Sequence, residues 1–271
     1  MERRLGVLAG SGLMPLRVAN SANSSGWLGC IIRFSGFAIK EGWPNWPHFE
    51  IPIGKIEKIF TELHKEKITD VVLCGGIKRP DLKNANIDFK GIKLLTKIAF
   101  KGDDGALKVI CKVIEGEGFK IRSPDEFVKD IKLPLGHIAG PDPNKNFEKS
   151  YKIGLSILNM LSPGDVGQSI AVQEGVILAI EAAEGTDSMI ERAGKLKKGG
   201  CGPILIKAPK IGQDCRVDQP VIGPETVLKS YKAGFSGIAC TSESVLVLDY
   251  DETLRIANKK KITLFSYSDK R

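Results

Sequence analysis

Two apolar segments that each end in glycines constrain the fold of this 271-residue chain more than any other feature. Arg4–Ala9 has the composition of a buried strand and is followed by Gly10-Ser11-Gly12, after which residues 13–22 show helical spacing. Residues 70–73 form a similar apolar run and precede Gly75-Gly76. Strands that alternate with helices and end in glycines predict a parallel sheet with a site at its carboxyl edge.

The segment 132–146 has the composition of a linker, with a Leu-Pro pair, two further prolines and Asn-Lys-Asn. We therefore expect an α/β protein with two domains. An N-terminal Rossmann-like parallel-sheet domain would cover residues 1–133, and a C-terminal catalytic domain of α/β or α+β class would cover 134–271. The active site is expected in a cleft between them.

Charge and composition limit the classes of partner that this chain can bind. The chain has 40 Lys+Arg against 32 Asp+Glu, a net charge of +8, which favours a nucleic acid, an anionic membrane surface or a phosphorylated small molecule. Nucleic acid is disfavoured, because aromatic residues make up only 7% and no nucleic-acid reader motif occurs. Apolar runs are far shorter than the roughly 20 residues of a spanning helix. Six dispersed cysteines without a C-x-x-C pair exclude the usual structural zinc spacings.

The loop Gly10-Ser11-Gly12 lies between a strand and a helix, where backbone N–H groups can approach a phosphate. The full dinucleotide fingerprint is broken, because Pro15 stands where the third glycine belongs. This disfavours an oxidoreductase that uses a nicotinamide cofactor. A tight turn without a ligand remains the alternative.

The second glycine loop continues into Gly76 and Arg79, with Pro80 beside the arginine. A guanidinium held on such a loop can bind a phosphate or a carboxylate through its rigid fork of donors. An ordinary exposed loop cation is the alternative interpretation.

Residues 181–187 place three carboxylates, together with the Thr186 hydroxyl, around Gly185. Clustered carboxylates at a strand-to-helix turn suit Mg²⁺, a hard cation that prefers oxygen ligands. Alternatively, Thr186 or Asp187 caps the helix that follows.

Residues 207–220 crowd charges of both signs onto a loop that prolines stiffen: Lys207, Lys210, Arg216, Asp214 and Asp218. This density predicts a phosphate-binding loop with a metal or a base beside it.

In this order along the chain, these motifs resemble the LpxI family, the UDP-2,3-diacylglucosamine pyrophosphatases of lipid A synthesis. The matching segments are 9–15, 76–80, 101–104, 165–168, 181–189, 207–210, 216–223 and 233–239. The most specific of them is 216–223. Departures are Ser11, Met14 and, next to the proposed catalytic position, Gln219.

The resemblance implies Mg²⁺-dependent hydrolysis of UDP-2,3-diacylglucosamine, with water attacking the α-phosphorus to give UMP and 2,3-diacylglucosamine 1-phosphate (lipid X). It implies that Asp218 is the essential aspartate, which either binds Mg²⁺ or orients the attacking water. A non-catalytic carrier of a nucleotide sugar or lipid is the alternative function. The expected substrate-binding residues are Gly10, Ser11, Gly12, Gly76, Arg79, Thr186, Asp187, Lys207, Lys210 and Arg216.

We also expect a cytoplasmic location with peripheral contact to the inner membrane. The sequence leaves the oligomeric state open, a homodimer included.

Overall fold

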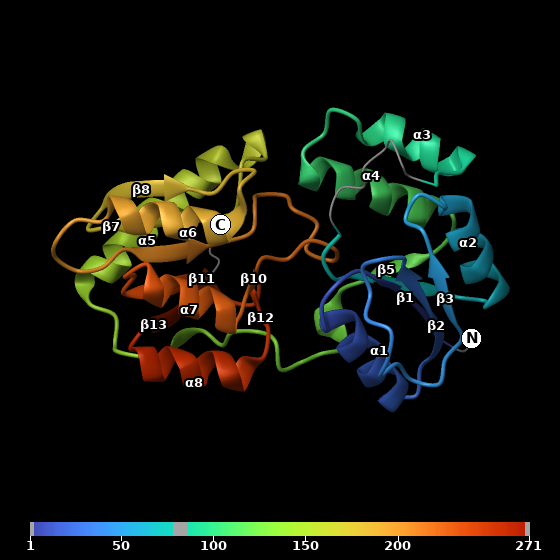
Figure 1. The fold of residues 1–271 in the computed structure, drawn as a ribbon, viewed down its shortest axis with the longest axis horizontal. Coiled ribbons are helices and arrows are strands. Elements are labelled where there is room, and N and C mark those ends of the chain that lie inside the picture. Colours follow the sequence, from blue (N-terminus) through green and yellow to red (C-terminus); the bar gives the residue numbers. More distant parts are fainter. Residues whose placement is uncertain (1–2, 78–85, 269–271) are drawn as a thin grey trace. The chain divides into compact units, whose positions relative to one another are not determined.

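The computed structural model describes residues 3–77 and 86–268, and the chain divides into two compact units (Figure 1). The first unit comprises Met1–Lys129 together with Arg216–Asp218. The second comprises Asp130–Cys215 and Gln219–Arg271.

The first unit contains a five-stranded sheet of order β3-β2-β1-β4-β5, in which all neighbouring strands are parallel. Its strands are β1 (Arg4–Ala9), β2 (Leu28–Phe34), β3 (His48–Ile51), β4 (Asp70–Cys74) and β5 (Lys120–Arg122). The order reverses between β1 and β4, so the carboxyl ends of these two strands flank a topological switch point. The Rossmann-like parallel sheet is confirmed.

Helices cover both faces of this sheet. Apolar residues of α2 and α4 pack on the face that includes Leu8, Ile32 and Val71. Helix α1 contacts β1, β2 and β4, and the alternate, fully buried strand residues Leu5 and Val7 point to its side. The helices of this unit are α1 (Met14–Ser24), α2 (Ile56–Lys65), α3 (Phe89–Ile98), α4 (Asp103–Gly116) and the 3₁₀ turn η1 (Pro124–Glu126).

The second unit contains a mixed six-stranded sheet of order β6-β13-β11-β9-β7-β8. The neighbouring pairs β13–β11 and β11–β9 are parallel, and the pairs β6–β13, β9–β7 and β7–β8 are antiparallel. The strands are β6 (Gly136–Ala139), β7 (Ser169–Gln173), β8 (Val176–Ile180), β9 (Ile204–Lys207), β11 (Gly237–Thr241) and β13 (Thr263–Tyr267). A separate parallel pair joins β10 (Val221–Ile222) to β12 (Leu246–Val247).

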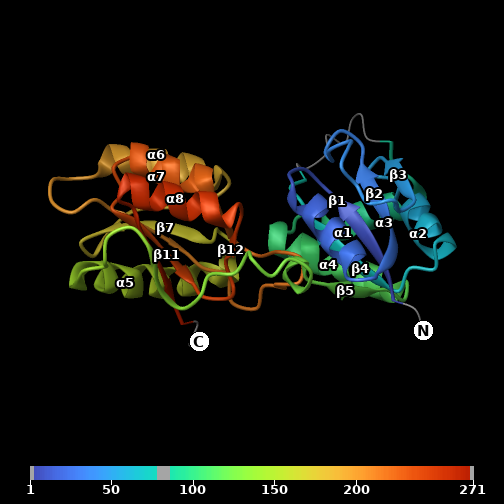
Figure 2. The same ribbon diagram turned by 90° about the horizontal axis from the view of Figure 1, so that it is seen from below.

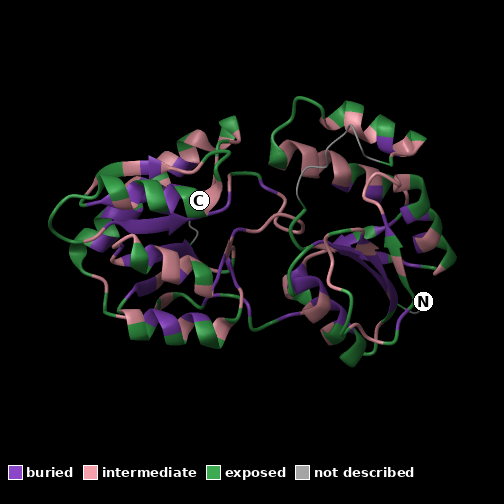
Figure 3. Cartoon of the chain, viewed as in Figure 1, coloured by how far each residue is buried: buried purple, intermediate pink, exposed green. Residues whose placement is uncertain are grey.

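Figure 2 shows this sheet between two helical layers, with α6, α7 and α8 on one face and α5 on the other. The strands that form its centre are buried (Figure 3). The helices are α5 (Lys145–Leu161), the 3₁₀ turn η2 (Ser162–Gly164), α6 (Gly185–Leu196), α7 (Pro224–Lys232) and α8 (Tyr250–Lys260). The predicted α/β class holds for both units.

Residues 216–218 belong to the first unit although the rest of their loop belongs to the second. Val217 packs against the apolar cluster that α2 and α4 form on the sheet. Arg216 Nη1 donates a hydrogen bond to Glu115 Oε1 of α4 at 2.7 Å. Asp218 is therefore attached to the parallel-sheet unit by the two residues that precede it.

Candidate functional site

The two glycine loops of the first unit are joined to each other. Ser11 N donates to Gly76 O at 2.9 Å, and Gly76 N donates to Ser11 O at 3.2 Å. The Ser11 hydroxyl also donates to Gly76 O at 2.9 Å, and Gly10 N donates to Cys74 O at 2.9 Å. The predicted residues are thus brought together at the switch point, although the Gly10 and Ser11 amides are engaged by carbonyls rather than directed at a ligand.

Close packing explains why glycine occupies position 10. A Cβ on Gly10 would lie 2.7 Å from Gly75 O and 2.8 Å from Gly76 O, distances at which backbone must move. Gly12 differs: its φ is +88° and a Cβ there would meet nothing within 4 Å. Gly10 therefore allows the close backbone contact between the two loops, whereas Gly12 provides a left-handed turn before α1. Arg79, the other residue predicted here, lies outside the described residues.

In the second unit, four side chains meet at the carboxyl end of β9. We call Lys207, Thr186, Glu181 and Ser169 the Lys207 cluster. Lys207 ends β9 and pairs in register with Ser169 of β7, Glu181 follows β8, and Thr186 lies in the first turn of α6. Lys207 Nζ donates to Thr186 Oγ1 at 2.9 Å, and that hydroxyl donates to Glu181 Oε1 at 2.8 Å. Thr186 thus links a buried ammonium to a carboxylate.

Burial determines the electrostatics of this cluster. Lys207 is only 6% exposed, and desolvation lowers the pKa of its ammonium below the ordinary 10.5, while the Glu181 carboxylate acts in the opposite direction. Within the described part of the chain, the buried Glu181 Oε2 has no hydrogen-bond partner. Neither does Thr241 Oγ1, at the end of β11 next to β9. These two atoms are therefore available for hydrogen bonds to a ligand.

The acidic turn 181–187 does not form the metal site that its composition suggested. Asp187 Oδ2 accepts a hydrogen bond from Lys229 Nζ at 2.6 Å, and Glu184 forms an ion pair with Arg192. Among residues 3–77 and 86–268, no three His, Cys, Asp or Glu side chains gather closely enough to hold a metal. The capping alternative is also not observed, because no side chain caps the first turn of α6.

Lys210 is the other predicted cation of this unit. Its ammonium forms an ion pair with Asp165, and its amide donates to Gln213 Oε1 at 2.7 Å. The side chain of Lys210 is 11% exposed. The pairing neutralises this lysine and stiffens the loop after β9.

The predicted site residues therefore fall into two sets. Gly10, Ser11, Gly12, Gly76, Arg216 and Asp218 belong to the first unit, and Thr186, Asp187, Lys207 and Lys210 belong to the second. Asp218 is half-buried at the end of a turn, and Arg216 is engaged with Glu115. The sequence did not indicate Ser169 and Thr241, which the pairing of β7, β9 and β11 brings close to Lys207. It also did not show that Glu181 is the partner of Thr186.

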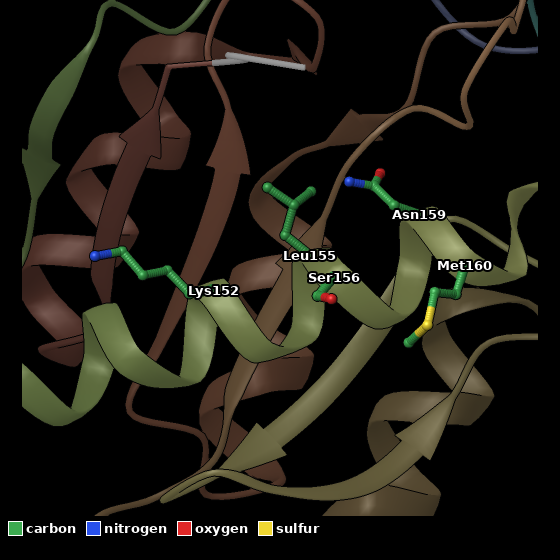
Figure 4. Close-up of a pocket in the computed structure, with 5 residues that line it drawn as sticks. All are labelled: Lys152, Leu155, Ser156, Asn159 and Met160. Carbon is green, nitrogen blue, oxygen red and sulfur yellow. The ribbon is translucent and has the colours of Figure 1, made fainter.

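A hollow of about 490 Å³ lies along α5 and is lined by Lys152, Leu155, Ser156, Asn159 and Met160 (Figure 4). All five residues come from one helix (Figure 4), and Leu155 among them also packs against the apolar cluster that α5 shares with the sheet. None of them was predicted as a site residue. The hollow carries a single cation and no carboxylate, so it lacks the groups of a hydrolytic centre.

The lowered pKa of Lys207 predicts a pH-dependent effect on stability. Since the unfolded chain binds this proton more tightly, the free energy of unfolding rises with pH between the lowered folded pKa and the ordinary 10.5. Lys207→Met removes that contribution. In urea unfolding, the free energy of unfolding of Lys207→Met minus that of wild type should therefore be largest near neutral pH. This difference should become smaller as the pH approaches 10.5.

Lys195→Met is the matched control, because Lys195 is exposed on α6. Its stability relative to wild type should stay constant over the same pH range. A difference for Lys207→Met that does not change with pH would contradict the desolvated ammonium.

No helix within residues 3–77 and 86–268 has both the length and the apolar character needed to span a bilayer.

Comparison with known proteins agrees with the two-domain architecture. Residues 4–131 match the model of the LpxI N-terminal domain, and residues 134–265 match that of the LpxI C-terminal domain. A curated relative, UDP-2,3-diacylglucosamine pyrophosphatase LpxI of Caulobacter vibrioides, is 32% identical over 265 residues that cover 94% of each chain.

A solved structure, N5-carboxyaminoimidazole ribonucleotide synthetase from Thermotoga maritima, is 13% identical. The match covers 67% of this chain and 42% of the solved chain. Its TM-score of 0.22 is too low to carry information on fold or function. The family matches and the curated relative agree over both units: the chain belongs to the LpxI family.

Proposed function

We propose that this protein hydrolyses the pyrophosphate of UDP-2,3-diacylglucosamine, with water attacking the α-phosphorus to give UMP and 2,3-diacylglucosamine 1-phosphate. The observation that carries the proposal is the match to the named pyrophosphatase across 94% of both chains. The buried cationic and hydroxyl groups of the Lys207 cluster supply chemistry that suits a phosphorylated substrate.

Lys207 neutralises negative charge that develops on the pyrophosphate. A donor in a low-dielectric environment acts more strongly on such charge than the same donor in water. Thr186 fixes the direction of the ammonium, and an anionic ligand beside it favours the protonated form. Lys210 and Asp165 hold the loop after β9, and Gly12 presents the N-terminal end of α1 to a phosphate.

Asp218 supplies the catalytic carboxylate, and we propose that the reaction requires Mg²⁺. This ion keeps several waters and is commonly bound through one or two carboxylates plus substrate phosphates. A half-buried aspartate therefore fits the role without a preformed cluster of ligands. Mg²⁺ would polarise a phosphoryl oxygen and neutralise developing charge.

The test is product analysis with purified protein. UMP should be released in the presence of Mg²⁺, and the reaction should stop when EDTA is added. In H₂¹⁸O the label should enter UMP, since attack at the α-phosphorus leaves the incoming oxygen on that product. Label in the lipid phosphate would contradict the proposed position of attack.

The absence of UMP at every divalent-metal concentration would refute hydrolysis. Substrate that stays intact and bound in Mg²⁺ would instead identify a carrier of the nucleotide lipid.

We further propose a cytoplasmic location with peripheral contact to the inner membrane. A substrate with two acyl chains resides in a bilayer, and a net charge of +8 favours anionic headgroups.

A further inference from the structure

The outer side of α3 exposes apolar side chains that no function assigned above requires. Phe89 is 66% exposed and Ile92 is 51% exposed, while Phe100, just beyond the helix, is fully exposed. Single exposed apolar residues are ordinary on protein surfaces. Here, however, Phe89, Ile92 and Thr96 are three and four positions apart, so they lie on one side of the helix. Phe100 follows shortly after the end of that helix. We call Phe89, Ile92, Lys93, Thr96, Lys97 and Phe100 the outer face of α3.

The opposite side of α3 is fixed to the rest of the unit. Asp88 caps the helix by accepting from Gly91 N at 2.8 Å, and its other oxygen accepts from Glu57 N of α2 at 2.8 Å. A Cβ on Gly91 would lie 2.3 Å from Gly54 O, so the helix backbone is in close contact there. Lys90 forms an ion pair with Glu117 at 2.8 Å. The helix cannot rotate to bury Phe89 and Ile92 without breaking these contacts.

Phe100 has an unfavourable backbone conformation as well as an exposed ring. Its φ is +71°, in the left-handed region that costs a bulky L-residue about 1–2 kcal/mol. No packing within the described residues offsets that cost, since the residue is fully exposed. An aromatic ring exposed in this way is available for contact with a partner that the described residues do not supply.

The charges around the outer face have one sign. Residues 89–101 contain neither aspartate nor glutamate. Of their four lysines, Lys93 and Lys97 lie on the outer face, whereas Lys90 is paired with Glu117 on the opposite side. Lys93 Nζ lies 4.4 Å from the centroid of the Phe89 ring, so a cation sits directly beside an exposed aromatic side chain. Aromatic and aliphatic residues flanked by lysines are typical of helices that lie in the interfacial region of a membrane.

We propose that the outer face of α3 docks on a bilayer that contains anionic lipids. Phe89, Ile92 and Phe100 enter the boundary between headgroups and acyl chains, and Lys93 and Lys97 lie against the headgroup phosphates. The proposal rests on the proposed function in one respect: a diacylated substrate gives the enzyme a reason to visit a membrane. The docking step itself requires no catalysis.

Vesicle co-sedimentation without substrate tests the proposal directly. Wild-type protein should bind vesicles that contain phosphatidylglycerol more strongly than vesicles of phosphatidylcholine alone. Phe89→Ser/Ile92→Ser/Phe100→Ser should lower the partition coefficient more than tenfold. Lys93→Gln/Lys97→Gln should lower it about tenfold to thirtyfold on the anionic vesicles alone.

Two matched variants control for a general loss of surface residues. Leu135→Ser/Val176→Ser/Leu196→Ser removes three apolar side chains that are 66%, 62% and 52% exposed on the second unit. Lys195→Gln/Lys198→Gln removes two exposed lysines from the same unit. Both should bind vesicles as wild type does, and thermal melting should show that all four variants are folded.

Hydrolysis assays separate docking from catalysis. The α3 serine variant should keep wild-type kcat on detergent-dispersed substrate and lose activity on substrate embedded in vesicles. Vesicle binding without UMP release would refute the proposed function and leave the docking surface standing.

Three results would overturn docking. The first is wild-type protein that fails to bind anionic vesicles. The second is a serine variant that still binds vesicles but shows a raised KM in detergent, which would assign the face to the acyl chains of the substrate. The third is a serine variant that dissociates from a dimer to a monomer, which would assign the face to a second copy of the chain.

Discussion

Replacing Asp218 with alanine is expected to lower kcat for UMP release about a thousandfold, the range for loss of a positioned carboxylate in proton transfer. The melting temperature should change by no more than about 3 °C, because a half-buried polar residue contributes little packing. The apolar contact that attaches this segment comes from Val217 and is untouched by the substitution. Activity measured beside a thermal melt separates a catalytic from a structural role.

Asp214→Ala provides a matched control, because Asp214 is a half-buried carboxylate four residues earlier on the same loop. We expect this variant to retain most of its activity. Asp218→Asn extends the test by keeping the shape of the side chain while removing its charge, and it should be as inactive as Asp218→Ala. An Asp218→Ala protein that unfolds, or that keeps most of its turnover, would show that the assigned role is wrong.

Gly10→Ala is expected to destabilise the first unit by about 3 kcal/mol. The added methyl group would meet two backbone carbonyls, Gly75 O at 2.7 Å and Gly76 O at 2.8 Å, so that neither neighbour can move as a flexible side chain could. Separating the loops would also strain the paired hydrogen bonds between Ser11 and Gly76. Urea unfolding followed by the fluorescence of Trp27, Trp43 and Trp46, all in this unit, measures the loss.

Gly12→Ala is the control for this prediction, since a Cβ at position 12 enters open space. Its φ of +88° is unfavourable for alanine, so we expect a smaller loss of about 1 kcal/mol. Equal effects of the two substitutions would indicate that backbone conformation, rather than the contact between the loops, determines the requirement for glycine at position 10.

Local sequence pattern predicted the elements whose residues are uniformly apolar on one side. Strand β1 has the bounds expected for it, and the helical spacing expected over 13–22 corresponds to α1, Met14–Ser24. Strand β13 was missed because Thr263 and Ser266 interrupt its apolar run. Both are buried, and their hydroxyls donate to the carbonyls of Pro141 and Pro134 at 2.8 and 2.7 Å. Hydrogen bonds so distant in sequence leave no local signal.

For the candidate site, the sequence indicated residue types but not the contacts that these residues make. Thr186 and Lys207 were both expected to bind substrate, and the structure joins them through a hydrogen bond. The burial of Lys207, and the orientation of Thr186 towards Glu181, depend on the register between β7 and β9 and on the start of α6. Glu181 and Asp187 were expected near one metal, yet they have different partners. Sequence alone does not show which side chain each carboxylate pairs with, because the fold determines those pairs.

The contacts of Arg216 and Val217 have a consequence for how the protein is made. Glu115 and Arg216 are 101 positions apart, so the first unit cannot finish its packing during synthesis until most of the second unit has been translated. A gene fragment that stops at residue 133 would omit Val217 from an apolar cluster that it helps to cover. The two units are therefore separate in their cores but interleaved along the chain, and they are expected to be inherited and expressed together.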